Sequence, residues 1–384
     1  MTYKKQIRLG MVGGGIDANI GEAHRFAARL DNRYNLLAGS LSSTPDRSKV
    51  SGQAIGLDPE RIYDNFTDMA EKESSRKDGI EAVAIVTPNN VHAESAIAFL
   101  KKGIHVICEK PLTATLDQAK DLAKVARESK ALFILTHNYS GYPLIRQARE
   151  MIQAGEIGKI ITVQAEYTIE WLSHAVEKEG LKQAIWRTDP SISGTGCVGD
   201  VGTHAFHLTR FVTGLEVEEI SAELATFVPD RKVDDLVMTK LRFKNGAKGM
   251  LWASQVAIGG ENALRIRVYG TKGSLDWNQE EPNYLVFAKQ NEPKRIITRM
   301  GSGATESGIR VSRLPKGHPE GYIEAFANIY TETADAILAY QKGEKPSDEI
   351  TYPNLDDGLE GIVFVDACVE SAKNNCKWIS LKKI

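Results

Sequence analysis

The stretch that decides the fold is Gly103-Ile104-His105-Val106-Ile107-Cys108-Glu109-Lys110-Pro111, an apolar run that ends in two charged residues and a proline. A lysine directly after a buried strand is costly unless its charge has a role. The proline restricts the backbone, so the ammonium group is aimed rather than mobile. We therefore predict a buried strand over Ile104–Cys108 and a functional Lys110. The alternative for Lys110 is a surface ion pair with Glu109.

Strands and helices alternate on both sides of this stretch. The expected strands are Ile7–Val12, Tyr34–Ser40, Ala82–Val86, Ile104–Cys108 and Leu132–Leu135, and the expected helices are Gly21–Leu30, Thr44–Ile55, Val91–Lys102 and Leu116–Ser129. Such alternation is typical of a parallel sheet covered by helices on both faces. In the first of these helices, the spacing places Ala23, Phe26, Ala27 and Leu30 on one apolar face.

The pattern becomes rich in strands after about Tyr139. The expected elements are a helix over Tyr142–Ala154, strands over Ile160–Trp171, Glu219–Phe227, Leu236–Phe243, Lys248–Ala257, Leu264–Tyr269 and Ser274–Trp277, a long loop over Met300–Gly321, and helices over Tyr322–Tyr340 and Leu355–Lys373. Asn245-Gly246 predicts a hairpin with a type I′ turn, because both residues tolerate positive φ angles. A border near residue 139 gives two domains, as expected for 384 residues.

Composition narrows the class of protein. The formal net charge of −2 gives no electrostatic reason to expect nucleic acid or an anionic membrane as a partner. There is no apolar signal segment and no apolar run long enough to span a bilayer. Four scattered cysteines, Cys108, Cys197, Cys368 and Cys376, indicate reduced thiols. We expect a cytoplasmic protein.

A glycine turn, Gly13-Gly14-Gly15, follows the first expected strand. Glycines at this place let a pyrophosphate approach the backbone, and the next helix offers its N–H groups. Ile16–Ile20 separate the turn from Gly21, so the spacing differs from G-x-G-x-x-G, and a plain tight turn is the alternative. Together with the aimed Lys110, the turn indicates a nicotinamide-dependent oxidoreductase.

The choice between NAD and NADP depends on the end of the second strand. A carboxylate that binds the NAD ribose is expected there, yet Ser42 and Ser43 occupy the turn and Arg47 follows. This pattern leans toward NADP, unless Arg47 is a solvated helix residue. The residues predicted to bind the cofactor are Gly13, Gly14, Gly15, Ile20, Ser42, Ser43, Arg47, Thr87, Pro88, Asn89, His92, Glu109, Lys110 and Asn138.

A second chemical cluster lies in the glycine-rich segment before Phe211. Asp200 and His204 are four residues apart and would share one helix face. A histidine can accept a proton at neutral pH, and a nearby carboxylate can orient it; the alternative is an acidic helix start beside a hydrogen-bonded core histidine. With Cys197 and His207 the pair matches no closed zinc pattern, so we predict no metal. Four aromatic residues are candidates either for stacking on a sugar ring or for the core: Tyr139, Tyr142, Trp171 and Trp186.

The glycine turn, Glu109-Lys110-Pro111 and Asp200-x-x-x-His204 together resemble the glucose–fructose oxidoreductase, inositol dehydrogenase and rhizopine-catabolism (Gfo/Idh/MocA) family, over nearly the whole chain. The resemblance implies an α/β protein with a Rossmann dinucleotide-binding domain at 1–139. It also implies a C-terminal α+β domain at 140–384, with an open, mostly antiparallel sheet for substrate and subunit contacts. The resemblance implies that Lys110, Asp200 and His204 are the catalytic residues.

A narrower likeness points to the levoglucosan-dehydrogenase-like branch. It rests on the long turn Gly13–His24, on Asn138-Tyr139-Ser140-Gly141-Tyr142-Pro143, on Trp186-Arg187 and on 314–322. Those relatives use NAD, so we expect NAD with NADP possible. His207 stands where many members carry an aspartate, which implies a different pattern of substrate hydroxyl groups. The residues expected to bind substrate are Lys110, Tyr139, Trp186, Arg187, Asp200, His204 and His207.

These features predict an NAD(P)-dependent dehydrogenase that oxidises a secondary alcohol of a sugar, anhydrosugar or cyclitol. The alternatives are a non-catalytic NAD(P)-binding sensor and a zinc-dependent alcohol dehydrogenase. The sequence leaves open whether Lys110 or His204 carries the proton last. Because Val237, Leu251 and Ala253 would occupy an open sheet face, we also expect a homodimer or homotetramer joined through the C-terminal sheets.

Overall fold

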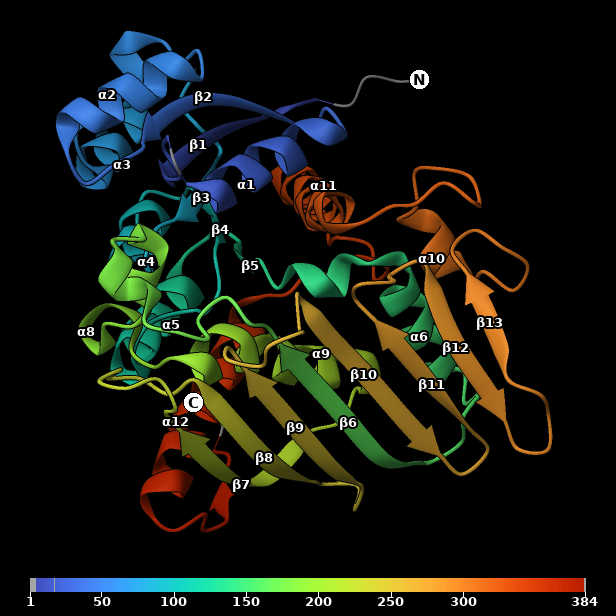
Figure 1. Ribbon diagram of the computed structural model, residues 1–384. Helices are drawn as coiled ribbons and strands as arrows, with labels where there is room; N and C mark the ends of the chain where they lie inside the picture. Colours follow the sequence, from blue (N-terminus) through green and yellow to red (C-terminus); the bar gives the residue numbers. More distant parts are fainter. Residues whose placement is uncertain (1–4, 17, 383–384) are drawn as a thin grey trace. The chain divides into compact units, whose positions relative to one another are not determined.

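The computed structural model describes residues 5–16 and 18–382, which fall into two compact units (Figure 1). The first unit contains the described residues up to Asn138 together with Ile323–Leu359. The second contains Tyr139–Tyr322 and the described residues from Glu360 on. The sequence-based division at residue 139 did not foresee that Ile323–Leu359 groups with the first unit.

The first unit is built on a five-stranded parallel sheet in the order β2-β1-β3-β4-β5. Its strands are β1 (Ile7–Gly13), β2 (Tyr34–Ser40), β3 (Ala82–Val86), β4 (His105–Cys108) and β5 (Phe133–Leu135). In the register, Met11 of β1 lies between Gly39 of β2 and Ala84 of β3. The order reverses between β1 and β3, which is where parallel sheets bind ligands beyond their strand ends.

Helices cover both faces of this sheet. The helices of the first unit are α1 (Asn19–Leu30), α2 (Pro45–Ala54), α3 (Phe66–Ser75), α4 (Asn89–Leu100), α5 (Leu116–Glu128) and, from Ile323 on, α11 (Tyr322–Gln341), with a 3₁₀ turn at Pro59–Arg61. Contacts join α3 to α4 and α4 to α5 in one layer, whereas α1 meets α11 in another. Right-handed crossovers that run in opposite directions from β1 and β2 put the two layers on opposite faces.

The buried face of α1 differs from the expected one. His24, Ala27 and Ala28 are buried, whereas Phe26 is 50% exposed and Leu30 is 46% exposed. The spacing of apolar residues predicted the wrong buried face of α1, because a polar residue, His24, occupies the centre of the face that is buried. It does so with hydrogen bonds to other buried groups, which remove the cost of burying it.

The second unit is built on a nine-stranded sheet in the order β13-β12-β11-β10-β6-β9-β8-β7-β14. Its strands are β6 (Ile160–Thr168), β7 (Val217–Ala225), β8 (Leu236–Phe243), β9 (Lys248–Ser254), β10 (Ala263–Gly270), β11 (Gly273–Asn278), β12 (Tyr284–Lys289), β13 (Arg295–Thr298) and β14 (Ile379–Ser380). Neighbouring strands are antiparallel except β6 and β9. The sequence reading omitted β12, β13 and β14.

Long helices pack on one face of this sheet (Figure 1). They are α6 (Pro143–Gln153), α9 (Thr203–Thr213) and, from Glu360 on, α12 (Leu355–Lys373); the shorter helices are α7 (Lys182–Arg187), α8 (Pro190–Ser193) and α10 (Glu306–Arg310), and 3₁₀ turns lie at Asn138–Gly141 and Val176–Glu179. Phe206 of α9 stacks on Phe364 of α12 with ring centroids 4.2 Å apart. None of the described helices is long and apolar enough to cross a membrane.

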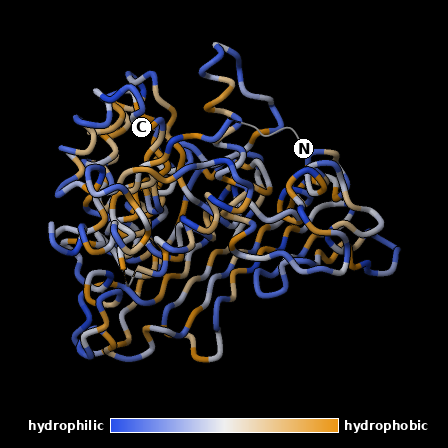
Figure 2. Tube along the Cα trace, turned by 90° about the horizontal axis from the view of Figure 1, so that it is seen from above, coloured by the Kyte–Doolittle hydropathy of each residue, from blue (hydrophilic) through white to orange (hydrophobic). Residues whose placement is uncertain are grey.

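Buried and more exposed residues alternate along β8 and much of β9. Hydropathy does not alternate in the same way, since Leu236, Val237 and Met238 are consecutive apolar residues; Figure 2 colours the trace by hydropathy. Val237, Leu251 and Ala253 are fully buried, and Cys368 of α12 contacts β8 at Thr239. Our assignment of those three apolar residues to the open face was therefore wrong by one position of the alternation, because the side-chain period of a strand is two. The open face instead carries Met238 and Met250, which are 48% and 53% exposed.

The turn between β8 and β9 and the long segment after β13 both differ from what the sequence predicted. In the β8–β9 hairpin only Gly246 has positive φ, at 90°, and its N–H donates to Phe243 O at 2.9 Å. The turn is therefore not type I′, which requires positive φ at Asn245 as well. The long segment after β13 contains α10 and is held by Arg299, which forms a buried ion pair with Glu320 at 2.8 Å and donates to Leu314 O at 2.7 Å.

Candidate functional site

The glycine turn after β1 forms a cradle of backbone in which added side chains would meet neighbouring atoms. Gly13 and Gly14 have φ angles of 75° and 67°, which other residues adopt only with strain. A Cβ on Gly13 would lie 2.6 Å from Val86 O, and one on Gly21 would lie 2.4 Å from Gly14 Cα. Gly21 therefore packs the start of α1 against the turn, as the third glycine of a dinucleotide fingerprint does. The cradle and the helix N-terminus suit a pyrophosphate.

Neighbouring elements hold the turn in place. The N–H of Gly15 donates to Leu41 O at 3.2 Å, and the N–H of Ile16 donates to Ser51 Oγ of α2 at 3.1 Å. Arg25 of α1 donates to Gly14 O at 2.5 Å. Sequence reasoning missed Ser51 and Arg25, since neither residue belongs to a recognisable motif.

The end of β2 carries the residues that would choose between NAD and NADP. The segment between β2 and α2 contains Ser42, Ser43 and Thr44 and no acidic residue. Thr44 donates its N–H to Ser42 Oγ at 3.4 Å, and Arg47 lies exposed in the first turn of α2. The role of these side chains toward a cofactor stays a prediction.

The ends of β3 and β4 are joined by His92. Thr87, Pro88 and Asn89 connect β3 to α4. From α4, His92 places Nδ1 2.8 Å from Pro111 O and Nε2 2.9 Å from Thr87 O. Burial, which outweighs these carbonyls, lowers the pKa of His92. His92 thus fixes two of the loops that carry predicted cofactor residues.

Glu109 and Lys110 follow β4, and the peptide bond from Lys110 to Pro111 is cis. Glu109 is only 7% exposed, so a surface ion pair with Lys110 is excluded. Its carboxylate accepts from His24 Nε2 at 2.8 Å and from the Thr136 hydroxyl. Burial by itself would raise the pKa of Glu109, but His24, Lys110 and Thr136 together hold it below its ordinary value. Glu109 is therefore a buried carboxylate. Asn138 lies beyond β5, and it is buried as well.

In the second unit, His204 lies on α9 among hydroxyl and amide groups. Its ring centroid is 4.8 Å from that of Tyr139, edge to face, and 6.0 Å from that of Tyr167. The two phenol oxygens are 2.6 Å apart, and Tyr167 donates to Asn262 Oδ1 at 2.6 Å. Burial and then the neighbouring Tyr139 raise the pKa of Tyr167 well above its usual range, so this phenol stays protonated. Asn262 was missed from sequence.

Asp200 lies in a π-helical turn, Val198–Gly202, that leads into α9. We expected one α-helix to carry Asp200 and His204; the wider turn is a feature often found at functional sites. Asp200 Oδ2 accepts from Gln255 Nε2 at 2.9 Å and lies 3.5 Å from Arg187 Nε. Asp200 is thus a carboxylate supported by an amide and a cation. Gln255, one residue beyond β9, was also missed from sequence.

Arg187 links Asp200 to two tryptophans. Its guanidinium lies 4.1 Å from the ring centroid of Trp186 and 5.7 Å from that of Trp171. Such contacts are favourable because the ring face is negative. The indole N–H of Trp186 donates to Gln183 Oε1 at 3.2 Å. Trp186 and Trp171, which we considered as sugar-stacking residues, therefore also hold Arg187.

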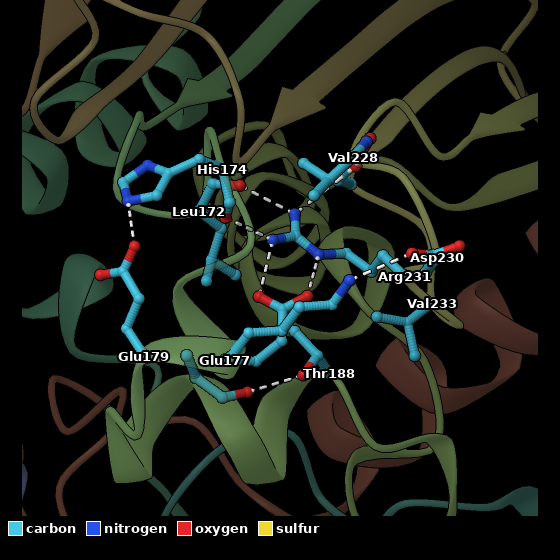
Figure 3. Close-up of polar contacts among 12 residues, drawn as sticks. Leu172, His174, Glu177, Glu179, Thr188, Val228, Asp230, Arg231 and Val233 are labelled. Carbon is cyan, nitrogen blue, oxygen red and sulfur yellow. Dashed lines mark hydrogen bonds and ion pairs between the residues drawn. The ribbon is translucent and has the colours of Figure 1, made fainter.

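The segment that carries Trp171 and α7 is clamped by one buried arginine (Figure 3). Arg231, in the connection from β7 to β8, forms a double ion pair with Glu177 at 3.1 and 3.0 Å. It also donates to Leu172 O at 2.8 Å and to His174 O at 2.9 Å. Two donors of this planar group thus fix the backbone that follows Trp171, and two bind the Glu177 carboxylate.

Two further candidates are buried in the second unit. Tyr142 is 1% exposed and lies 5.3 Å from the ring of Trp277, so it is a core residue. His207 is 3% exposed beside Phe211. Burial, followed by the charges of Arg210, Arg146 and Arg149, lowers the pKa of His207 well below its usual range. Within residues 5–16 and 18–382, no group of three His, Cys, Asp or Glu side chains is arranged to hold a metal ion.

Comparison with known proteins gives two family matches. The model described as "Oxidoreductase family, NAD-binding Rossmann fold" matches residues 7–149, and the GFO/IDH/MocA C-terminal domain matches residues 145–276. The chain belongs to the Gfo/Idh/MocA oxidoreductase family. It is accordingly an oxidoreductase with an NAD-binding Rossmann domain, as its glycine turn and parallel sheet predicted.

Other proteins are similar to this chain over nearly its whole length. An oxidoreductase from Sinorhizobium meliloti is 54% identical, with 98% of this chain and 100% of that chain covered and a TM-score of 0.89. An inositol dehydrogenase homolog from Azotobacter vinelandii, complexed with NADH and myo-inositol, is 34% identical, with 98% of each chain covered and a TM-score of 0.91. Levoglucosan dehydrogenase from Pseudarthrobacter phenanthrenivorans is 28% identical, with 99% of each chain covered.

Proposed function

We propose that this oxidoreductase oxidises a secondary alcohol of a sugar, anhydrosugar or cyclitol. The observation that carries the proposal is a buried histidine, His204, set beside a network of Tyr139, Tyr167 and Asn262. Hydroxyl and amide groups that both donate and accept hydrogen bonds match the chemistry of a polyol. The relatives that act on levoglucosan or bind myo-inositol support this substrate class.

The roles of the residues follow from acid–base chemistry. NAD, when bound, supplies the hydride acceptor. His204 takes the proton of the substrate hydroxyl as general base. Lys110 donates a hydrogen bond to the same oxygen and stabilises its developing negative charge. Asp200, supported by Gln255 and Arg187, accepts a hydrogen bond from a neighbouring hydroxyl or orients His204.

The remaining substrate residues set specificity in this proposal. Tyr139 and Trp186 offer ring faces and edges to the substrate, and Arg187 holds Asp200 through their ion pair. His207 stays neutral because of its burial and the arginines around it. Since many family members carry an aspartate there, we expect a hydroxyl pattern different from that of the inositol enzymes.

The glycine cradle fits the pyrophosphate of either cofactor, and we propose that NAD is preferred, with NADP possible. The cofactor contacts we propose run along the strand ends from Gly13 to Asn138.

We also propose that the protein is a homodimer or homotetramer. The open face of the second sheet has a hollow of 480 Å³ lined in part by Met238, Met250 and Trp252, which a second sheet would cover. A monomer by light scattering at micromolar concentration would contradict this assembly.

The decisive experiment is a panel of sugars, anhydrosugars and inositols, each tested with NAD and with NADP and followed by the absorbance of the reduced nicotinamide. We expect turnover of at least one cyclic polyol. Cofactor binding without turnover across the panel would favour a sensor instead. Activity that is lost on chelation and restored only by zinc would favour a zinc-dependent alcohol dehydrogenase.

A further inference from the structure

Three buried polar side chains, His24, Glu109 and Tyr330, form a chain in the first unit, and only Glu109 among them belongs to the predicted cofactor contacts. His24, on α1, is fully buried, and Tyr330, on α11, is 1% exposed. His24 Nε2 lies 2.8 Å from Glu109 Oε1, and His24 Nδ1 lies 2.7 Å from the Tyr330 hydroxyl oxygen. Glu109 follows β4, so three separate elements meet here. A carboxylate and an imidazole are costly core residues, and packing alone does not explain their presence.

The direction of these hydrogen bonds is set by the chemistry of the groups. The Glu109 carboxylate can only accept, so His24 Nε2 carries a proton and donates to it. In that neutral tautomer Nδ1 accepts, and the Tyr330 hydroxyl donates to it. Burial and then the charge of Glu109 raise the pKa of Tyr330, so its hydroxyl keeps the proton that it donates. Phe326 and Tyr330 pack on the imidazole, with ring centroids 4.9 Å and 5.8 Å from it, and restrict its rotation.

The carboxylate end of the chain reaches the lysine's own backbone. Glu109 Oε1 accepts from His24 and from the Thr136 hydroxyl, while Oε2 accepts the N–H of Lys110 at 3.3 Å. The Glu109 carboxylate thus connects α1 and the residue after β5 to the backbone N–H of Lys110. Without His24, Glu109 would remain buried with one strong donor fewer, and the Lys110 peptide would lose its fixed support.

We propose that His24 is a positioning residue for Lys110, acting through Glu109. The inference rests on the proposed function in so far as Lys110 acts on the substrate. His24 touches neither substrate nor cofactor in this role. His24 fixes the Glu109 carboxylate, which in turn accepts the N–H of Lys110. Tyr330 keeps the His24 imidazole in the required orientation.

The test compares four variants of the full-length protein. His24→Phe removes both hydrogen bonds, whereas His24→Gln keeps an N–H donor close to the place of Nε2. Tyr330→Phe removes only the far hydroxyl. Tyr34→Phe is the matched control, because the Tyr34 hydroxyl donates to the backbone oxygen of Tyr330 at 2.8 Å in the same buried cluster but lies outside the chain.

We expect His24→Phe to lower kcat by about 10- to 100-fold, as a misplaced reacting group does, with the KM for NAD within about twofold of wild type. His24→Gln should recover most of the loss, Tyr330→Phe should lie between them, and Tyr34→Phe should match wild type. A lost hydrogen bond that merely destabilised the fold would affect Tyr34→Phe as much as Tyr330→Phe and would not be rescued by glutamine.

A second measurement does not need substrate turnover. The rate at which acetic anhydride acetylates Lys110, relative to other lysines in the same digest, reports how its amine is presented. We expect this relative rate to change in His24→Phe, to return in His24→Gln and to stay at the wild-type value in Tyr34→Phe. If wild type oxidises no polyol, the proposed function fails while this comparison still decides the role of His24. Unchanged labelling and unchanged kcat in a folded His24→Phe protein would overturn the inference.

Discussion

The two units hold their polar site residues in different ways. In the first, the contacts around the turns after β1 and β3 involve backbone groups: Gly15 donates to Leu41 O, and His92 contacts Thr87 O and Pro111 O. Glu109, which His24 and Thr136 hold, is the exception there. In the second, side chains hold side chains, as Gln255 holds Asp200. A parallel sheet brings its strand ends to one edge, so short local motifs suffice to build a cofactor site. The predicted substrate residues and the side chains that hold them come from segments that are far apart in the sequence, so no single local motif specifies them.

The largest expected effect tests this difference in the second unit. His204→Ala removes the proposed general base and should lower kcat by about 10²- to 10⁴-fold. The affinity for NADH should change little, because the glycine cradle lies in the first unit. Steady-state kinetics and NADH fluorescence titration measure the two quantities. Near-normal kcat would refute the assignment of His204.

Acid should weaken the first unit through His105. Its Nδ1 accepts the N–H of Leu132 at 2.9 Å, and burial lowers its pKa from 6.5 to about 4. The folded state binds this proton less readily than the unfolded one, so the contribution is complete above about pH 6.5 and is lost as pH falls toward 4. In His105→Asn the amide oxygen accepts the same N–H without titrating. The free energy of unfolding, variant minus wild type, should fall by up to about 3 kcal/mol from pH 4 to 7.

The second unit should respond in the opposite direction through Asp234. This buried carboxyl accepts the N–H groups of Gly196 at 2.8 Å and Val198 at 2.7 Å, yet burial raises its pKa from 3.8 to about 6. Its contribution is complete below about pH 3.8 and is lost as pH rises through 6. For Asp234→Asn the same difference in urea unfolding should rise by up to about 3 kcal/mol from pH 4 to 7. The same sign for both variants would contradict the assignment of one of them.

The sequence predicted the elements better than their faces. Tyr34–Ser40, Ala82–Val86, Leu236–Phe243 and Leu355–Lys373 were expected with the bounds that the structure has. Apolar periodicity alone chose the wrong face of α1, because His24 is buried by hydrogen bonds that only tertiary structure supplies. It also misplaced Val237, because an open sheet with apolar residues on both faces does not reveal which one the helices cover.

Short motifs indicated where candidate site residues lie along the chain. The structure has a turn with positive φ at Gly13 and Gly14 and a buried Glu109 at these places, whereas the roles of the residues stay predictions. Asn262, Gln255 and Arg231 were not predicted, since each acts through a partner far away in the sequence. No spacing rule relates residues that meet only through the order of strands in an antiparallel sheet.

The smallest expected effect concerns the one place in the first unit where a side chain would choose the cofactor. The turn after β2 offers Ser42, Ser43 and the exposed Arg47, without the acidic residue that usually binds the NAD ribose. If Arg47 contacts a 2′-phosphate, Arg47→Ala should raise the KM for NADP and leave that for NAD unchanged. We expect the wild-type protein to prefer NAD or to use both cofactors, because the backbone cradle serves either one. A wild-type kcat/KM ratio above about 100 in favour of NADP, equivalent to about 2.7 kcal/mol, would show that this side chain outweighs the cradle.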